Sequence, residues 1–178
     1  DTLSNTDEGT SYLESADIFN MDPVELMFSP TGYIGCENYF DTHLNAIGYF
    51  VVDVVHKNIF AVKGKEIQMI SASNVKHWFA KNLKDNLNNP YKDNGRIWAF
   101  NEDTNTLYLA QHSHNENGNE DGSFTLSYSP IRNIWISFHT FIPTTGFSTR
   151  NGLFWVKNGQ IFKVSKSNFG KYFEDTQE

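Results

Sequence analysis

The segment from His112 to Gly122 holds several possible metal ligands. His112 and His114 are two residues apart, and Glu116 and Asp121 follow them. Imidazole and carboxylate groups can together bind a divalent metal ion. The same segment is rich in Asn and Gly, however, and a metal site needs support from rigid elements. The pattern therefore favours a solvated loop, and we expect no metal and no cofactor.

Other ionisable residues offer acid-base chemistry. His139 titrates near neutral pH, but no Ser or Cys with an obvious base partner accompanies it, which favours a structural hydrogen-bonding role. A glycosidase would need two carboxylates that flank its substrate. Nothing in the sequence places any two of the candidate carboxylates at a working distance, so we expect no enzyme. These candidates are Glu37, Asp41, Asp53 and Glu66.

Aromatic residues are the strongest candidates for contacts with other molecules. Aromatic rings provide a large contact area at a low cost in conformational entropy. We expect Trp98 and Trp135 to be buried, and Trp155 to lie on a contact surface. The candidate packing or interaction residues are Trp98, Trp135, Phe138, His139 and Trp155.

Strands are the elements that must position these side chains. From Phe124 to Val164, apolar and polar residues alternate between turn signals, and this period-two pattern predicts antiparallel strands with one buried face. Apolar residues at helical spacing predict one short helix near Lys76 to Leu87, which Ser71 or Ser73 would cap and Asn88-Asn89-Pro90 would end. The remaining predicted strands cover residues 49–54, 59–62, 67–70, 96–100 and 107–111.

Composition narrows the class of protein. Aromatic residues make up 15% of the 178 residues, which favours β structure. The net charge is −7 without a basic stripe, so we expect no specific binding to nucleic acid. Cys36 is the only cysteine, which excludes an intrachain disulfide. The apolar runs are too short to span a membrane.

Two hairpin-like segments share a pattern. Residues 59–70 and 153–164 match almost residue for residue, from Ile59-Phe60-Ala61-Val62-Lys63 against Leu153-Phe154-Trp155-Val156-Lys157 onward. Such repeats are typical of β-propeller blades. We expect a mainly β fold of antiparallel meanders that resemble propeller blades. A closed propeller typically needs at least four blades, and we count two to three, so a neighbouring polypeptide would have to complete the structure.

The expected organisation has four parts. Residues 1–20 form a polar, acidic arm that is flexible or bound to a partner. Residues 21–93 form a first blade-like unit with the short helix, in which residues 24–28 are either a helical turn or an extended entry strand. Residues 94–165 form a second and a third unit, and residues 166–178 form a polar tail. The abrupt start without Met leads us to expect a segment of a longer polypeptide.

Residues 29–164 resemble a known family. The most specific piece is Trp135-Ile136-Ser137-Phe138-His139 with Ile142-Pro143, after Ser127-Tyr128-Ser129-Pro130. This succession is similar to that of the muzzle, or stabilisation, proteins in the tails of crAss-like bacteriophages.

The resemblance implies a structural role in the virion. Such a protein sits at the distal end of a short, podovirus-like tail, where it helps to close the DNA channel and takes part in host contact and genome ejection. Its partners would be other tail proteins, further copies or fragments of the same polypeptide, and a host surface receptor. The chain would be made in the bacterial cytoplasm. The alternatives are a tail module that binds a receptor or glycan through loops such as residues 112–122 and, less favoured, a glycan hydrolase.

Overall fold

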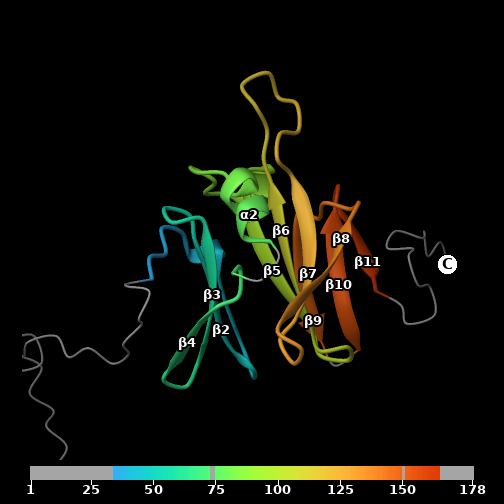
Figure 1. Ribbon diagram of the computed structural model, residues 1–178. Coiled ribbons are helices and arrows are strands. Elements are labelled where there is room, and N and C mark those ends of the chain that lie inside the picture. The colour runs from blue at the N-terminus through green and yellow to red at the C-terminus, as the bar shows by residue number, and fades with distance from the viewer. Residues whose placement is uncertain (1–33, 73–74, 150, 165–178) are drawn as a thin grey trace, which may run out of the picture.

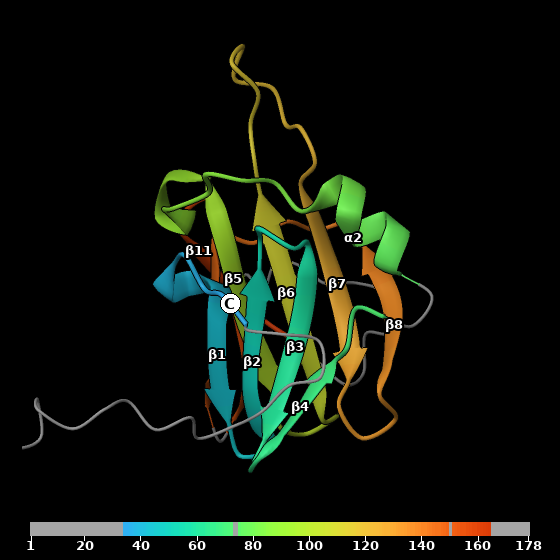
Figure 2. The same cartoon turned by 60° about the vertical axis from the view of Figure 1, so that its left-hand side comes forward.

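Three antiparallel sheets stack face to face in the computed structural model, which describes residues 34–72, 75–149 and 151–164 (Figures 1 and 2). Over these residues, the prediction of a mainly β fold of antiparallel meanders with one short helix is confirmed. The predicted arm, residues 1–20, and the predicted tail, residues 166–178, lie outside the described residues.

The first sheet follows a short 3-10 helix, η1 (Tyr39–Asp41). Its strands pair in chain order and are β1 (Thr42–Asn45), β2 (Gly48–Asp53), β3 (Asn58–Lys63) and β4 (Glu66–Met69). Residue patterns predicted the last three strands. They missed β1, because Leu44 is its only strongly apolar residue and a single residue shows no alternation.

Helix α2 is shorter than the predicted helix. Helix α2 covers Lys76–Asn82 and ends where Leu83 adopts an extended backbone. Leu83 and Leu87 are nevertheless buried, so the apolar spacing that suggested a helix to Leu87 continues in extended chain. Ser71 does not cap the helix; its hydroxyl accepts a hydrogen bond from the Ile59 N–H at 3.0 Å.

The second sheet forms the middle layer. The 3-10 helix η2 (Pro90–Lys92) precedes it. Its strands also pair in chain order and are β5 (Gly95–Asn101), β6 (Thr106–His112), β7 (Phe124–Ser129) and β8 (Ile134–His139). All residues of β5 and β7, and all but the last of β6, are buried. The prediction of one buried face, made for Phe124 to Val164, is wrong for β7, because a sheet covers each of its faces.

The third sheet has three described strands, in the order β11-β10-β9. They are β9 (Thr145–Thr149), β10 (Gly152–Lys157) and β11 (Gln160–Lys163). Strand β10 shows the predicted alternation, because Leu153 and Trp155 are fully buried while their neighbours are only half-buried.

Two apolar clusters hold the layers together. The larger lies between the first and second sheets and includes Phe50, Phe79, Trp98 and Tyr128. The smaller lies between the second and third sheets, around Trp155. Strand β5 contacts both β1 and β9, so the first strands of the three sheets lie together along one side of the stack.

The two segments that match in sequence occupy different places in their sheets. Residues 59–70 contain β3 and β4, the third and fourth strands of the first sheet. Residues 153–164 contain β10 and β11, the second and third strands of their sheet when counted from β9. Both hairpins turn through a glycine with positive φ, Gly64 or Gly159. The match therefore reflects a common hairpin chemistry and not equivalent positions in successive sheets.

A glycine allows the second and third sheets to approach closely. A Cβ atom on Gly146 would lie 2.4 Å from Cζ3 of Trp155 and 3.0 Å from Cβ of Ala99. We expect Gly146→Ala to lower the free energy of unfolding by about 1–3 kcal/mol, because the buried Trp155 ring must shift. Urea unfolding measures this loss. Gly35→Ala is the control, since the nearest atom to its added Cβ would be 3.8 Å away; equal losses would contradict the prediction.

Candidate functional site

The outer face of the third sheet, defined by Phe147, Phe154, Val156 and Ile161, is rich in apolar side chains. Strand pairing puts Phe147 beside Phe154 and Val156 beside Ile161. The Phe147 and Phe154 rings stack at 5.4 Å with an interplanar angle of 11°. Phe147 is 42% exposed and Ile161 is 61% exposed. This face can bind an apolar surface of matching shape.

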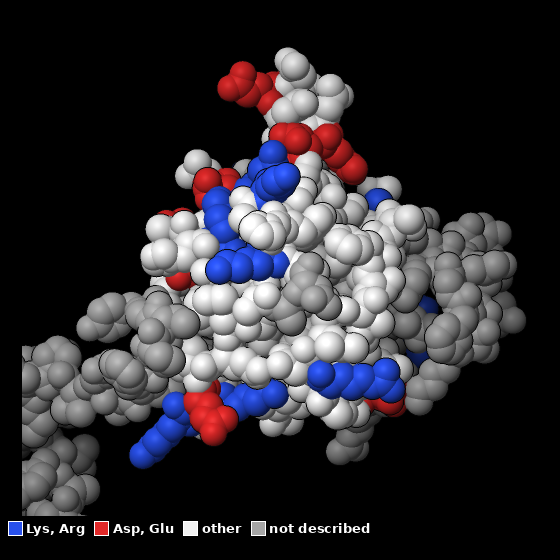
Figure 3. All heavy atoms as spheres, in the orientation of Figure 1, with Lys and Arg blue, Asp and Glu red and all other residues white. Residues whose placement is uncertain are grey.

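A second exposed apolar region lies along strand β8. The side chains of Ile134, Ile136 and Phe138 are about half exposed, and Ile131 precedes them in the turn. Figure 3 shows that the surface over β7 and β8 is largely free of charged side chains, with Lys and Arg at its margins. A contiguous uncharged surface with several exposed apolar residues is typical of a protein interaction site.

The structure buries some of the candidate aromatic residues and leaves others exposed. Trp98 is buried, as predicted, against Phe50 in the larger cluster. Trp135 is half-buried and not fully buried; its indole N–H donates to the Ile70 carbonyl at 2.9 Å. Phe138 remains 56% exposed with one edge against Trp78. Trp135 therefore links the first and second sheets, and Phe138 is available for contact.

The prediction that Trp155 lies on a contact surface is wrong. The ring is fully buried and packs edge-on against Tyr108 and close to Phe141. Alternation along β10 means that Trp155 and Phe154 lie on opposite faces of the third sheet. In the structure Trp155 is on the inner face and Phe154 is on the outer face. His139 packs against Tyr108 and Phe141 as well, and burial lowers the pKa of its imidazole. Its surroundings favour a structural role.

The candidate catalytic carboxylate Asp41 belongs to a buried ion pair. Nη1 of Arg96 donates to both carboxylate oxygens of Asp41 at 2.8 and 3.0 Å, and both side chains are nearly inaccessible. Burial raises the pKa of Asp41, and the guanidinium of Arg96 opposes this rise. A carboxylate held in this way joins η1 to β5 and cannot reach a substrate.

Gln111 extends this pair into a larger network of hydrogen bonds. Its side-chain oxygen accepts from Nε of Arg96 at 3.0 Å, and its amide donates to the Asn82 and Gly122 carbonyls at 2.7 Å. Arg96 also donates to the Lys84 carbonyl. The network ties the segment after α2 to the second sheet through hydrogen bonds among buried polar groups.

Asp53 is likewise a structural carboxylate. It accepts hydrogen bonds from the Gly35 N–H at 3.2 Å, from the His56 N–H at 3.0 Å and from Nδ1 of His56 at 2.8 Å. Burial by itself would raise its pKa, but the hydrogen bonds from His56 and Gly35 outweigh burial and leave the pKa lowered. Asp41 and Asp53, two of the four candidate carboxylates, are therefore both engaged in structural contacts.

The lowered pKa of Asp53 predicts a dependence of stability on acid pH. The ionised form stabilises the folded chain above the ordinary value of 3.8, and this contribution is lost as pH falls through the lower folded-state pKa. We expect Asp53→Asn to cost about 1–3 kcal/mol at pH 7, with a difference from wild type that shrinks below about pH 4. Thermal unfolding from pH 7 to 3 measures this difference. A constant difference would contradict the assignment.

The loop from His112 to Gly122 is held by an ion pair and by a contact between an imidazole and a carboxylate. Nδ1 of His112 lies 3.1 Å from Asp93, and Lys84 pairs with Asp121 at 2.9 Å. Among the described residues, no group of three or more His, Cys, Asp and Glu side chains could hold a metal ion. Burial lowers the pKa of His112, which keeps its imidazole neutral near pH 7.

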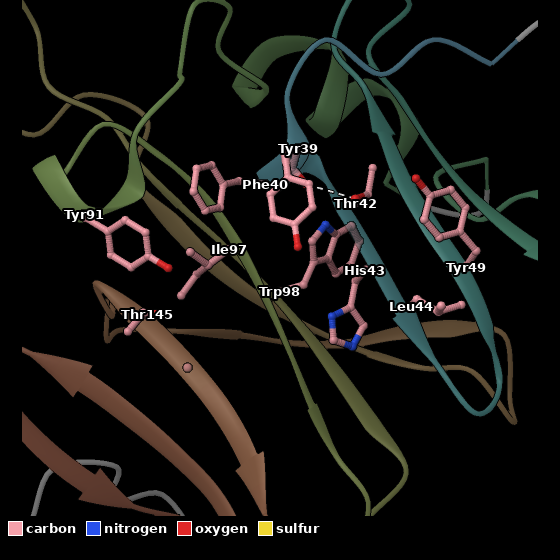
Figure 4. A pocket seen from close by; sticks show the side chains of 11 residues that line it. Tyr39, Phe40, Thr42, His43, Leu44, Tyr49, Tyr91, Ile97, Trp98 and Thr145 are labelled. Carbon is pink, nitrogen blue, oxygen red and sulfur yellow. Dashed lines mark hydrogen bonds between the residues drawn. The ribbon is translucent and has the colours of Figure 1, made fainter.

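An open hollow of about 620 Å³ lies where the first strands of the three sheets meet. Figure 4 shows Tyr91 and Tyr49 on opposite sides, with Trp98 and His43 between them. No Asp, Glu, Lys or Arg side chain is among the described residues that line it. Sequence reasoning missed this hollow, because the strand that carries His43 was not predicted.

Comparison with family models and with curated proteins finds no match to this chain. Among the described residues, no helix combines the length and the apolar character that crossing a membrane requires.

Proposed function

We propose that this chain is a structural subunit of a phage tail, of the muzzle type, in which its stacked sheets continue into further sheets from neighbouring polypeptide. The observation that carries the proposal is the apolar outer face of the third sheet, where Phe147, Phe154 and Ile161 remain accessible. The inner face of the same sheet buries Leu153 and Trp155 against the second sheet. A further sheet on the outer face would repeat this mode of packing.

The arrangement of strands supports a propeller-like assembly. Successive antiparallel meanders place their first strands, β1, β5 and β9, together along one side, as blades do around an axis. The remaining blades would come from further copies or fragments of the same polypeptide or from other tail proteins. The resemblance of residues 135–143 to muzzle proteins supports the location at the distal end of a tail, with roles in channel closure, host contact and genome ejection.

Loss of the outer-face rings is expected to weaken assembly without unfolding the chain. Sedimentation of the full chain should show association that increases with concentration, and Phe147→Ser with Phe154→Ser should reduce it by tenfold or more in association constant, because about 1.4 kcal/mol corresponds to tenfold. Thr149→Ser, an exposed change on β9, is the control. Unchanged association of the double variant would refute the role of this face.

The location in a tail has a separate test. Antibodies to this chain should label the tail end of intact virions of the phage that encodes it. Its absence from purified virions would refute a structural role in the virion whatever the chain does in solution.

A second candidate function is recognition of a receptor glycan, and the hollow lined by Tyr39, Tyr91, Trp98 and His43 favours it. Tyrosine rings and an uncharged lining suit neutral sugars, which stack on aromatic faces. Binding of the full chain on a glycan array, lost in Tyr39→Ala with Tyr91→Ala but retained in the Phe147 and Phe154 double variant, would separate recognition from assembly.

A further inference from the structure

Two neighbouring hollows in the structure form one groove. Residues of the same three strands, β1, β5 and β9, line the hollow of about 620 Å³ and a second hollow of about 230 Å³. Four residues belong to both linings: His43, Leu44, Trp98 and Gly146. The groove is in the size range of small-molecule sites, and its two parts give room for an elongated ligand.

The groove contains buried polar atoms that have no hydrogen-bond partner among the described residues. They are Nε1 of Trp98, Nε2 of His43 and Nδ2 of Asn45, and all three residues line the groove. Trp98 is only 6% exposed, and a buried donor without a partner lowers the stability of a protein. The indole nitrogen of Trp155 is also unpartnered, but Trp155 lines neither hollow. Of these two indoles, Trp98 is therefore the one placed to meet a ligand.

A ligand reaches these covered atoms only if a side chain at the rim moves. Tyr39 and Leu44 line the groove and are 85% and 75% exposed. Side chains with this exposure change rotamer within nanoseconds. Their rotation would open the groove without unpacking the core.

The lining selects a neutral ligand. No Asp, Glu, Lys or Arg is among the described residues that line the larger hollow, and Glu102 lines the smaller one. An anion would meet Glu102 without a cation to pair with. A cation would face the N–H groups of Trp98 and Asn45, which can only donate. A neutral group with an acceptor oxygen satisfies these donors at no cost in charge.

Trp98 and His43 together require an acceptor and a donor. The indole N–H of Trp98 only donates. Burial lowers the pKa of His43, so its imidazole is neutral near pH 7 and one ring nitrogen can accept. The two rings are nearly parallel, with centroids 6.5 Å apart (Figure 4). An amide carries its acceptor and its donor on different atoms and can serve both rings, whereas a single hydroxyl would have to lie within hydrogen-bond distance of both.

We propose that the groove binds a neutral oligosaccharide that carries N-acetyl groups, an inference that rests on the glycan recognition considered above and specifies its ligand. The sugar rings stack on Tyr39 and Tyr91, which are 85% and 62% exposed. The acetamido carbonyl accepts from Nε1 of Trp98, and the acetamido N–H donates to His43. A peptide also contains amides, but the exposed tyrosine rings favour a sugar, whose flat face of C–H groups covers them.

Nuclear magnetic resonance of the full chain, labelled with ¹⁵N in its tryptophan side chains, tests the proposal. The probes are the β-1,4-linked trimers of N-acetylglucosamine and of glucose, which differ only in an acetamido group or a hydroxyl at C2 of each ring. We expect the acetylated trimer to shift the indole N–H signal of Trp98 and to leave that of Trp155 unchanged. The glucose trimer should bind about tenfold more weakly, because it lacks the amide that hydrogen-bonds Trp98.

Each other result overturns the proposal. Equal affinity for the two trimers, or binding that leaves the Trp98 signal unchanged, would exclude recognition of the N-acetyl group while leaving recognition of a glycan intact. No binding of either trimer would exclude this ligand, and the glycan array would then decide separately whether the chain recognises any glycan. An acetylated triglycine methylamide that shifts the Trp98 signal as strongly as the acetylated trimer would mean that the groove takes a peptide.

Discussion

Arg96→Met should lower the free energy of unfolding by about 3–5 kcal/mol, because it leaves the buried Asp41 carboxylate without its partner. The loss is larger than that of a surface ion pair, since Arg96 and Asp41 are 1% and 2% exposed and water cannot replace the guanidinium. Gln111 and the Lys84 carbonyl lose a donor in the same variant. Chemical unfolding followed by tryptophan fluorescence measures the effect.

Two further variants decide whether burial is the cause. Asp41→Leu combined with Arg96→Met should recover part of the loss, because no unpaired carboxylate remains. Asp85→Asn removes the partner of Lys57 in a more exposed pair, where Asp85 is 61% exposed, and should cost less than about 1 kcal/mol. A comparable loss from Asp85→Asn would contradict the explanation.

Trp155→Ala should mainly lower stability and Phe154→Ala should mainly weaken association, although the two residues are adjacent in β10. Trp155 is fully buried against Tyr108 and Phe141, so its truncation should cost about 3–5 kcal/mol in stability. Phe154 is on the outer face of the third sheet and only half-buried. Its truncation should cost less than half as much and should weaken association instead.

Unfolding and sedimentation of the same two samples measure both effects. Each variant is the control of the other, because both remove one aromatic ring from one strand. Similar stability losses with unchanged association in Phe154→Ala would mean that the outer face of the third sheet has no partner.

These predictions separate two uses of aromatic residues in one protein. Trp98, Trp155 and Tyr128 are buried and hold the layers of the fold together. Phe138 and Phe147 remain about half exposed and gain only when a neighbour covers them. The proposed role as an assembly subunit would use both kinds, because such a subunit must fold and then bind its neighbours through surfaces that remain exposed.

The sequence alone predicted the hairpins because the residues that specify a hairpin, its alternating strands and its turn, are close together in the chain. Alternation and turn residues located β2 to β6 to within a few residues and predicted further strands between Phe124 and Val164, and the apolar spacing located the start of α2. The same local signals could not find β1. They also extended α2 to Leu87, because a buried leucine in an extended segment has the same spacing as one in a helix.

Only the tertiary structure decided which face of each strand is inside. Period-two alternation separates Trp155 from Phe154 but does not say which of them faces the second sheet, and this choice reversed the assignment of Trp155. Both faces of β5, β6 and β7 are buried by sheets whose strands are far from them in the sequence. The ion pair of Asp41 with Arg96 joins residues 55 positions apart. The hollow where β1, β5 and β9 meet likewise needs strands that are distant in the sequence. Contacts between distant segments arise from the stacking of sheets, which no local pattern specifies.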